Sequence, residues 1–188
     1  MFKLFVMNKI AVQLSTGFEE IEAISIIDVL RRAEMEVVVV SITGNLEVEG
    51  AHKIKVIADQ LFEDVIFDDM DMIVLPGGMP GSTNLKNHSG LKTQLLNFHK
   101  KKKSLGAICA APLVFGNLGI LKNKTATCYP GFEDQLLEAN VTGNDVEIAD
   151  HIITGKGAGV AIDFALKIVE NLKGISFAAE LGKEMMVK

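Results

Sequence analysis

The chain has 188 residues, of which 48% are hydrophobic and 23% charged, and its formal net charge is −5 at pH 7. A chain of this length and composition can bury a core without disulfides or metals, so we expect one folded domain over residues 1–188. The acidic balance argues against nucleic acid as a partner, because nucleic-acid-binding proteins normally present a basic face.

The first nine residues are apolar but interrupted by Lys3 and by Asn8-Lys9. No small-residue cleavage site follows them, so we expect no signal peptide, and Met7 is an alternative start to Met1. No stretch reaches membrane-spanning length, so we expect no membrane partner.

Two cysteines, Cys109 and Cys128, are too few for a disulfide framework, and the four histidines show no metal-ligand spacing. These counts predict a cytoplasmic protein with reduced thiols and no bound metal.

In chain order, apolar runs typical of buried strands alternate with segments of helical spacing. The first half predicts strands at Ile10–Leu14, Val37–Ile42 and Asp71–Leu75, of which the second is rich in β-branched residues, and a hairpin around Val48 and Ile54–Ile57. It also predicts a helix at Glu20–Ala33, with an apolar stripe at Ile21, Ile24, Ile27 and Leu30.

The second half repeats the alternation. It predicts helices at Leu91–Lys101, Pro112–Leu118, Glu133–Ala139, Gly159–Leu172 and Ile175–Met186, and strands at Ser104–Ile108, Thr125–Thr127, Val146–Ala149 and His151–Thr154. Such alternation predicts an α/β fold in which helices cover both faces of a mostly parallel central sheet.

Cys109 lies where a predicted strand runs directly into a predicted helix, within the small-residue segment Ala107–Pro112. Small neighbours suit a sharp turn of the nucleophile-elbow type, and the N–H groups at the start of the following helix favour a thiolate. We therefore expect an exposed, ionised thiol, and the alternative is a buried structural cysteine.

Gly77-Gly78 follow another buried strand, and glycines there can expose backbone N–H donors. With the N–H of Ala110 these donors would form an oxyanion hole, although an ordinary glycine-rich turn is the alternative.

Glu22 lies near the end of the first strand, one position after Ile21. A helix N-terminus is sufficient reason for Glu19 and Glu20, whereas Glu22 can turn toward the site at the strand ends. In an apolar setting its carboxyl group would have a raised pKa and could exchange a proton with the sulfur.

Four segments occur together in the order and spacing of the ThiJ/PfpI superfamily: Gly17–Glu22, Val74–Gly78, Ala107–Pro112 and Gly155–Gly159. The chain most resembles the branch of DJ-1 and YajL over nearly its whole length. The resemblance implies a flavodoxin-like α/β sandwich with a nucleophile elbow, usually as a homodimer.

The resemblance also implies roles for individual residues. Cys109 would be the nucleophile and the oxidisable thiol, and Glu22 its protonated partner, while backbone N–H groups of Gly78 and Ala110 would polarise a bound carbonyl. Ala110 stands where protease-like members have a histidine, so we do not expect a peptidase.

Further candidate pocket residues are less specific. Tyr129 precedes Pro130 where the branch has a histidine, and His52 lies in the hairpin region where it has an arginine, although we favour a surface position for His52. The remaining candidates are Gly77, Gly157 and Ala158. We expect Cys128 to be a buried apolar residue, with a resolving cysteine as the alternative.

These residues predict a cofactor-free enzyme that attacks small aldehydes such as methylglyoxal, or early glycation adducts of proteins, through Cys109 with Glu22 as proton carrier. The alternative is a non-enzymatic sensor of oxidative stress or a redox-regulated chaperone, in which Cys109 is oxidised to a sulfinate.

Overall fold

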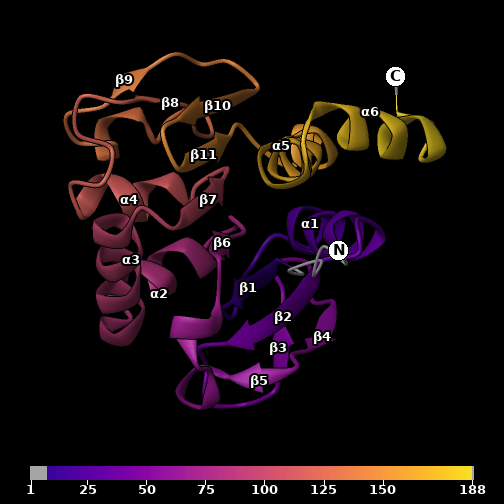
Figure 1. The fold of residues 1–188 in the computed structure, drawn as a ribbon. Coiled ribbons are helices and arrows are strands. Elements are labelled where there is room, and N and C mark those ends of the chain that lie inside the picture. Colours follow the sequence, from indigo (N-terminus) through magenta and orange to yellow (C-terminus); the bar gives the residue numbers. More distant parts are fainter. Residues whose placement is uncertain (1–7, 188) are drawn as a thin grey trace.

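The computed structural model describes residues 8–187, so the choice between Met1 and Met7 lies outside the described residues. A seven-stranded sheet forms the centre in the order β10-β11-β7-β6-β1-β2-β5 (Figure 1). All of its strand pairs are parallel except β10 with β11. Its strands are β1 (Lys9–Leu14), β2 (Glu36–Ser41), β5 (Gln60–Leu61), β6 (Met72–Leu75), β7 (Ser104–Ile108), β10 (Val146–Ala149) and β11 (Ile152–Gly155).

Helices cover both faces of this sheet (Figure 1). One face carries α1 (Glu20–Arg32), α5 (Ala161–Lys173) and α6 (Ile175–Glu184), and the other carries α2 (Gly81–Asn87), α3 (Ser89–Lys101) and α4 (Pro112–Asn117). Each helical layer packs its apolar side chains onto alternate residues of the strands, which produces two separate core clusters. The predicted α/β architecture is therefore confirmed.

Smaller elements decorate the sheet. The expected hairpin forms from β3 (Glu47–Glu49) and β4 (Lys55–Ile57), and β8 (Thr125–Ala126) pairs in parallel with β9 (Asn140–Val141). The helix predicted over Glu133–Ala139 is wrong, because only the 3-10 turn Glu133–Gln135 forms and the chain then extends to pair with β8. Further 3-10 turns lie at Phe62–Asp64, Phe67–Asp69 and Ala158–Val160, the last of which replaces the expected first turn of α5.

The apolar stripe predicted for α1 is rotated. Ile21 and Ile24 are 58% and 46% exposed, while the helix buries Glu22, Ala23 and Ile26 together with Ile27, Val29 and Leu30. Steps of three and four from Glu22 and Ala23 describe this face better than steps of three from Ile21. The rotation turns Glu22 inward, toward the carboxyl ends of the strands.

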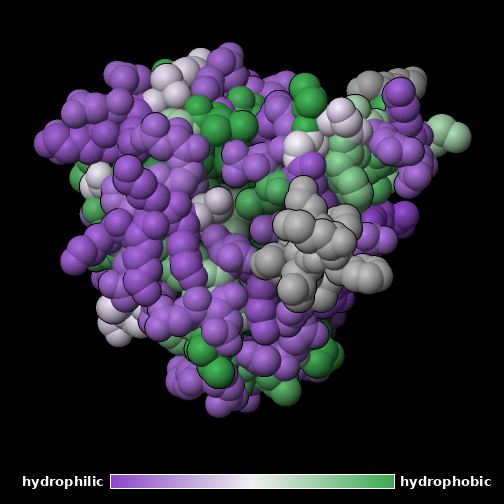
Figure 2. All heavy atoms as spheres, viewed as in Figure 1, coloured by the Kyte–Doolittle hydropathy of each residue, from purple (hydrophilic) through white to green (hydrophobic). Residues whose placement is uncertain are grey.

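The surface over α3 is almost entirely hydrophilic, as Figure 2 shows on the left of the view. This helix fully buries only Leu91, Leu95 and Phe98, and its remaining positions are partly or largely exposed. Among residues 8–187, no helix is long and apolar enough to cross a membrane.

Candidate active site

Cys109 occupies a tight turn between β7, which ends at Ile108, and α4, which begins at Pro112. Its φ of 64° lies in the left-handed region that side-chain-bearing residues seldom adopt. Two backbone hydrogen bonds hold the turn: the N–H of Cys109 donates to the Gly155 carbonyl at 2.9 Å, and its carbonyl accepts from the Tyr129 N–H at 2.8 Å. The expected elbow is therefore present.

The glycines after β6 pass directly against this turn. A Cβ atom on Gly77 would lie 2.6 Å from the Cys109 Cβ and 2.7 Å from Oε2 of Glu22, so no side chain fits between the thiol and the carboxyl group. Gly78 has a φ of 93°, which a glycine adopts without strain. Its N–H and that of Ala110 both donate hydrogen bonds that favour the Cys109 thiolate.

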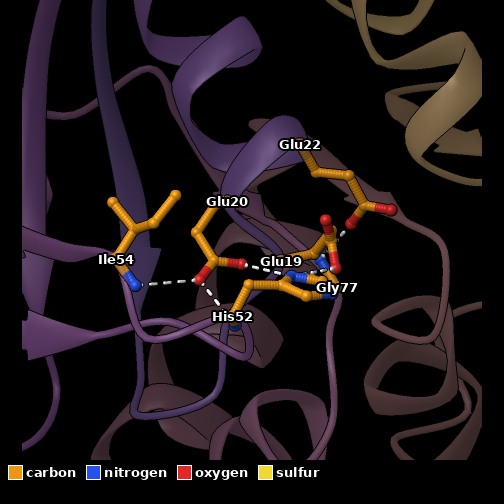
Figure 3. A network of polar contacts seen from close by, with 6 residues as sticks. All are labelled: Glu19, Glu20, Glu22, His52, Ile54 and Gly77. Atoms are coloured by element: carbon orange, nitrogen blue, oxygen red, sulfur yellow. Dashed lines mark hydrogen bonds and ion pairs between the residues drawn. The ribbon is translucent and has the colours of Figure 1, made fainter.

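Glu22 projects from the first turn of α1 into the same place (Figure 3). Its side chain is fully buried, and Oε2 accepts a hydrogen bond from the Gly77 N–H at 2.8 Å. Oε1 has no hydrogen-bond partner among the described residues, which leaves it available for a proton. Burial raises the pKa of Glu22 to about 7, against the opposing hydrogen bonds of Cys109 and Gly77, and the charge of Glu19 adds to the rise.

The expectation of an exposed, ionised thiol needs correction. Cys109 is only partly exposed, and burial, followed by the charge of Glu22 and its hydrogen bond with the thiol, raises the pKa of Cys109 to about 12. The N–H groups of Ala110 and Gly78 act in the opposite direction but are outweighed. A short turn cannot compensate for both burial and a neighbouring carboxylate.

Cys109 and Glu22 therefore behave as one acid with two protons. The pair loses its first proton near pH 7 and its second near pH 12, so between these values it holds a single proton, which resides mainly on the sulfur and can pass to the carboxyl group. The sulfur can be a thiolate in this state when the carboxyl group holds the proton. The pair thus replaces the isolated low-pKa thiol that we expected.

Glu20 forms a second polar cluster where α1 meets the loop between β3 and β4 (Figure 3). Its Oε1 accepts from the N–H of His52 at 2.7 Å and of Ile54 at 3.4 Å, and its Oε2 lies 2.9 Å from Nδ1 of His52. Burial alone would raise the pKa of Glu20, but these hydrogen bonds lower it overall. Nothing local in the sequence indicated this role, because the partners lie more than thirty residues away.

His52 itself is largely exposed, as the surface alternative proposed, and Nδ1 also lies 3.7 Å from Oε2 of Glu19. Glu19, Glu20 and His52 have ligand-type atoms within 4.8 Å of one another, the kind of grouping that can hold a metal ion. The sequence spacing did not reveal it, because Glu19 and Glu20 lie at the start of α1, with Glu19 just before the helix, and His52 is on the loop between β3 and β4.

The candidate residues Tyr129, Gly157 and Ala158 lie together. With Pro130, Lys156 and Val160 they line a pocket of about 290 Å³. The Tyr129 ring covers Gly157, where a Cβ atom would lie 3.3 Å from Cδ2 of the tyrosine. The Tyr129 backbone N–H donates a hydrogen bond to the Cys109 carbonyl. Among the described residues that line this pocket His52 is missing, and Tyr129 connects the pocket to the elbow.

Cys128 is buried, as expected of a small apolar residue. Burial, with a contribution from the charge of Glu133, raises the pKa of its thiol to about 11. Unlike Cys109, its thiol is not paired with a buried carboxyl group that could accept its proton.

Comparison with known proteins gives a consistent picture. The sequence profile of the DJ-1/PfpI family matches residues 8–171. Protein DJ-1 homolog B of Arabidopsis thaliana is 37% identical over 183 residues, which cover 96% of this chain and 42% of that protein, so the chain spans less than half of that relative. The glutathione-independent glyoxalase DJR-1.2 of Caenorhabditis elegans is 35% identical over 158 residues and 83% of each chain.

A solved structure agrees with this family assignment. The structure of oxidized Toxoplasma gondii DJ-1 superposes with a TM-score of 0.91 at 36% sequence identity, covering 95% of this chain and 98% of that one. The likeness confirms the mostly parallel central sheet flanked by helices.

Proposed function

The chain belongs to the DJ-1/PfpI family, and from this premise we propose that it is a cofactor-free enzyme acting on small reactive aldehydes through Cys109 and Glu22. The observation that carries the proposal is the shared-proton pair: a thiol at a strained elbow beside a buried carboxyl group whose pKa is raised to about 7. A relative named as a glutathione-independent glyoxalase supports this class of substrate.

The first step would use the single proton of the pair. As the Cys109 sulfur attacks the aldehyde carbon of methylglyoxal or glyoxal, Glu22 holds the thiol proton, and a carbon–sulfur bond forms. The N–H groups of Gly78 and Ala110, which already point at the sulfur, would stabilise the negative charge on the aldehyde oxygen. That oxygen takes up the proton held by Glu22 to give a hemithioacetal, which leaves Glu22 as a carboxylate able to act as a base.

The second step would move hydrogen within the substrate. Glu22 removes the proton from the former aldehyde carbon and returns it to the neighbouring carbonyl carbon, while a proton is exchanged between the two oxygens, which converts the hemithioacetal into a thioester. Water then cleaves the carbon–sulfur bond, releasing lactate or glycolate and restoring the thiol. One carbon is oxidised and its neighbour reduced, so no external oxidant or cofactor is needed.

Three further statements, on a related reaction, the location and the oligomeric state, belong to the same proposal. The related deglycase reaction would use the same cysteine on early glycation adducts, whereas Ala110 in place of a histidine argues against peptide hydrolysis.

We propose a cytoplasmic location, because free thiols persist in reducing compartments. The exposed Ile21 and Ile24 on α1 support a homodimer, since an apolar strip beside the site favours a second copy.

The decisive experiment is the conversion of methylglyoxal by the purified full-length protein, with lactate measured directly. We expect lactate from the wild type and none above background from Cys109→Ser, while Cys128→Ser, the matched control at a buried cysteine, retains activity. Absence of lactate from the wild type, or equal rates for wild type and Cys109→Ser, would rule the proposal out.

A second function is favoured by the oxidized form of the Toxoplasma relative. Cys109 would then act as an oxidant sensor or as a switch for chaperone activity, stopping at the sulfinate beside Glu22. Peptide mass spectrometry after mild peroxide treatment should show two added oxygens on Cys109. Equal oxidation of Cys128, or none on Cys109, would eliminate this alternative.

A further inference from the structure

A crevice separate from the Cys109 elbow lies at the carboxyl ends of β1 and β2, beside α2 (Figure 1). It has a volume of about 360 Å³, within the range of small-molecule sites. Its polar lining consists of Ser15, Thr16, Thr43, Asn84, Asn87 and His88. In open α/β sheets, ligands bind outside the carboxyl ends of the strands, so the place itself is a typical one.

The polar groups of the crevice are held in defined orientations. The Asn84 side chain donates through Nδ2 to the Thr16 carbonyl at 3.1 Å, which leaves its Oδ1 as an acceptor. Nδ1 of His88 accepts from the Leu91 N–H at 3.0 Å, so the neutral ring carries its proton on Nε2 and presents a donor. The edge of Phe62, with ring centroids 4.5 Å apart, fixes the plane of the His88 ring.

The lining is polar but carries no formal charge. Neither a carboxylate nor an ammonium group belongs to it, and burial lowers the pKa of His88, which keeps the imidazole neutral at pH 7. Hydroxyl and amide groups that both donate and accept match a ligand that also does both. A phosphate or carboxylate would find no counter-charge here.

A second observation points to a polar occupant. Gln13 is fully buried with both side-chain polar atoms unpartnered within the described part of the chain, and the same holds for Oγ of Ser82 on α2. Gln13 alternates with Val12 and Leu14 on β1 and therefore shares the face of Ala11, which α2 covers. Gln13 and Ser82 each lie two residues from a lining residue, Ser15 and Asn84, and ordered water that enters from a polar crevice can satisfy such atoms.

We propose that this crevice is a second binding site, independent of the thiol chemistry, for a small neutral polyhydroxyl compound of the sugar or sugar-alcohol class. Oδ1 of Asn84 accepts from a ligand hydroxyl, and Nε2 of His88 donates to another. The hydroxyls of Ser15 and Thr16 and the amide of Asn87 complete the contacts.

The test is a titration of the full-length, isotopically labelled protein with ribitol and with sorbitol, followed by backbone amide shifts. Sugar alcohols have no carbonyl group, so Cys109 cannot attack them, and the result is independent of the proposed aldehyde reaction. We expect saturable shifts at millimolar concentration, confined to residues 15–16, 42–43 and 84–88.

Variants then assign the site. Thr16 and Asn87 are both exposed, so the double change Thr16→Val with Asn87→Ala should leave the fold intact and weaken binding about tenfold. Lys86→Ala, on the same helix but outside the lining, is the matched control and should bind as the wild type does.

Three outcomes would overturn the proposal. They are shifts that do not saturate, equal affinity in the wild type and the double variant, and shifts centred on Cys109 and Tyr129. Tighter binding of ribitol 5-phosphate than of ribitol would overturn the neutral character of the site.

Discussion

Two carboxyl groups on the first turn of α1 have opposite properties. Glu20 and Glu22 are both buried, with 4% and 0% of their surfaces exposed. Glu20 accepts hydrogen bonds from two backbone N–H groups and faces the His52 ring, and its pKa is lowered. Glu22 accepts one backbone N–H, has an unpartnered oxygen, and has its pKa raised to about 7.

The difference shows that burial alone does not set the charge of a carboxyl group. The number of donors facing it decides whether the carboxylate or the acid is stabilised. Glu20 is therefore a fixed anion that organises the loop between β3 and β4. Glu22, two residues away, accepts a hydrogen bond from only one backbone N–H among the described residues, and it remains able to exchange a proton with Cys109.

The largest effect should come from removing the exchangeable proton. Glu22→Gln keeps the size of the side chain but cannot accept the thiol proton, so kcat/KM for methylglyoxal should fall about 100- to 10,000-fold. Steady-state assays with circular dichroism as a check on folding would measure this. A fall of less than about fivefold would mean that Glu22 is not the proton carrier.

The pH profile of Cys109 alkylation sharpens the same point. In the wild type the rate with a neutral alkylating reagent should rise about tenfold per pH unit and level off above 7, where the pair holds one proton. In Glu22→Gln the rise should continue beyond the ordinary cysteine value of 9.0, because the thiol stays buried. Site-resolved mass spectrometry separates Cys109 from Cys128, and superimposable profiles would contradict the shared-proton pair.

Stability should depend on pH through Glu22 with a defined sign. Because the pKa of Glu22 rises from 4.5 to about 7 on folding, its protonation favours the folded state, and this contribution is complete below 4.5 and lost as pH rises through 7. The rise is equivalent to about 3 kcal/mol. Denaturant unfolding at a series of pH values should show Glu22→Gln gaining that amount relative to wild type, whereas a pH-independent difference would refute it.

Glu20→Gln should lower the stability of the fold while leaving the activity nearly unchanged. Loss of the charge weakens the hydrogen bonds from the loop, so the free energy of unfolding at neutral pH should fall by about 1–3 kcal/mol while kcat/KM stays nearly unchanged. Because the pKa of Glu20 is lowered on folding, its contribution disappears as pH falls through the folded value. A catalytic defect comparable to that of Glu22→Gln would remove the distinction between the two carboxyl groups.

The smallest effect should be that of His52→Gln. The imidazole is exposed and pairs with Glu20 rather than entering the pocket of Tyr129, so kcat/KM should change less than about fivefold. Kinetic assays at pH 6 and 8 would measure it. A larger loss would place His52 in the substrate path after all.

The sequence was sufficient to predict the backbone features of the candidate site because the signals there are local. A cysteine among small residues at a strand-to-helix junction predicts an elbow, and two glycines after a buried strand predict close backbone approach. The inward turn of Glu22 was also anticipated, although the stripe used to support it was placed one residue off. That a single domain extends over residues 1–188 stays a prediction.

The elements and the pKa shift that the sequence did not predict depend on long-range contacts. The segment Gly81–Asn87 has one large apolar residue, Leu85, so no periodicity predicts α2. The helix is held by contacts with the loop after β1, where Gly81 packs against Gly17 and Asn84 donates a hydrogen bond to the Thr16 carbonyl. The strands β5 and β9 have two residues each and exist only through their partners. The raised pKa of Cys109 likewise depends on how deeply three separate segments enclose it.

The left-handed backbone at Cys109 has an evolutionary consequence. A glycine or asparagine would adopt a φ of 64° more readily than cysteine does, so the fold itself gives no advantage to a thiol there. In a lineage that no longer used the sulfur, drift would tend to replace Cys109 with one of those residues. A cysteine at this turn is therefore expected only where the sulfur has a task, such as the one that the proposed function gives it.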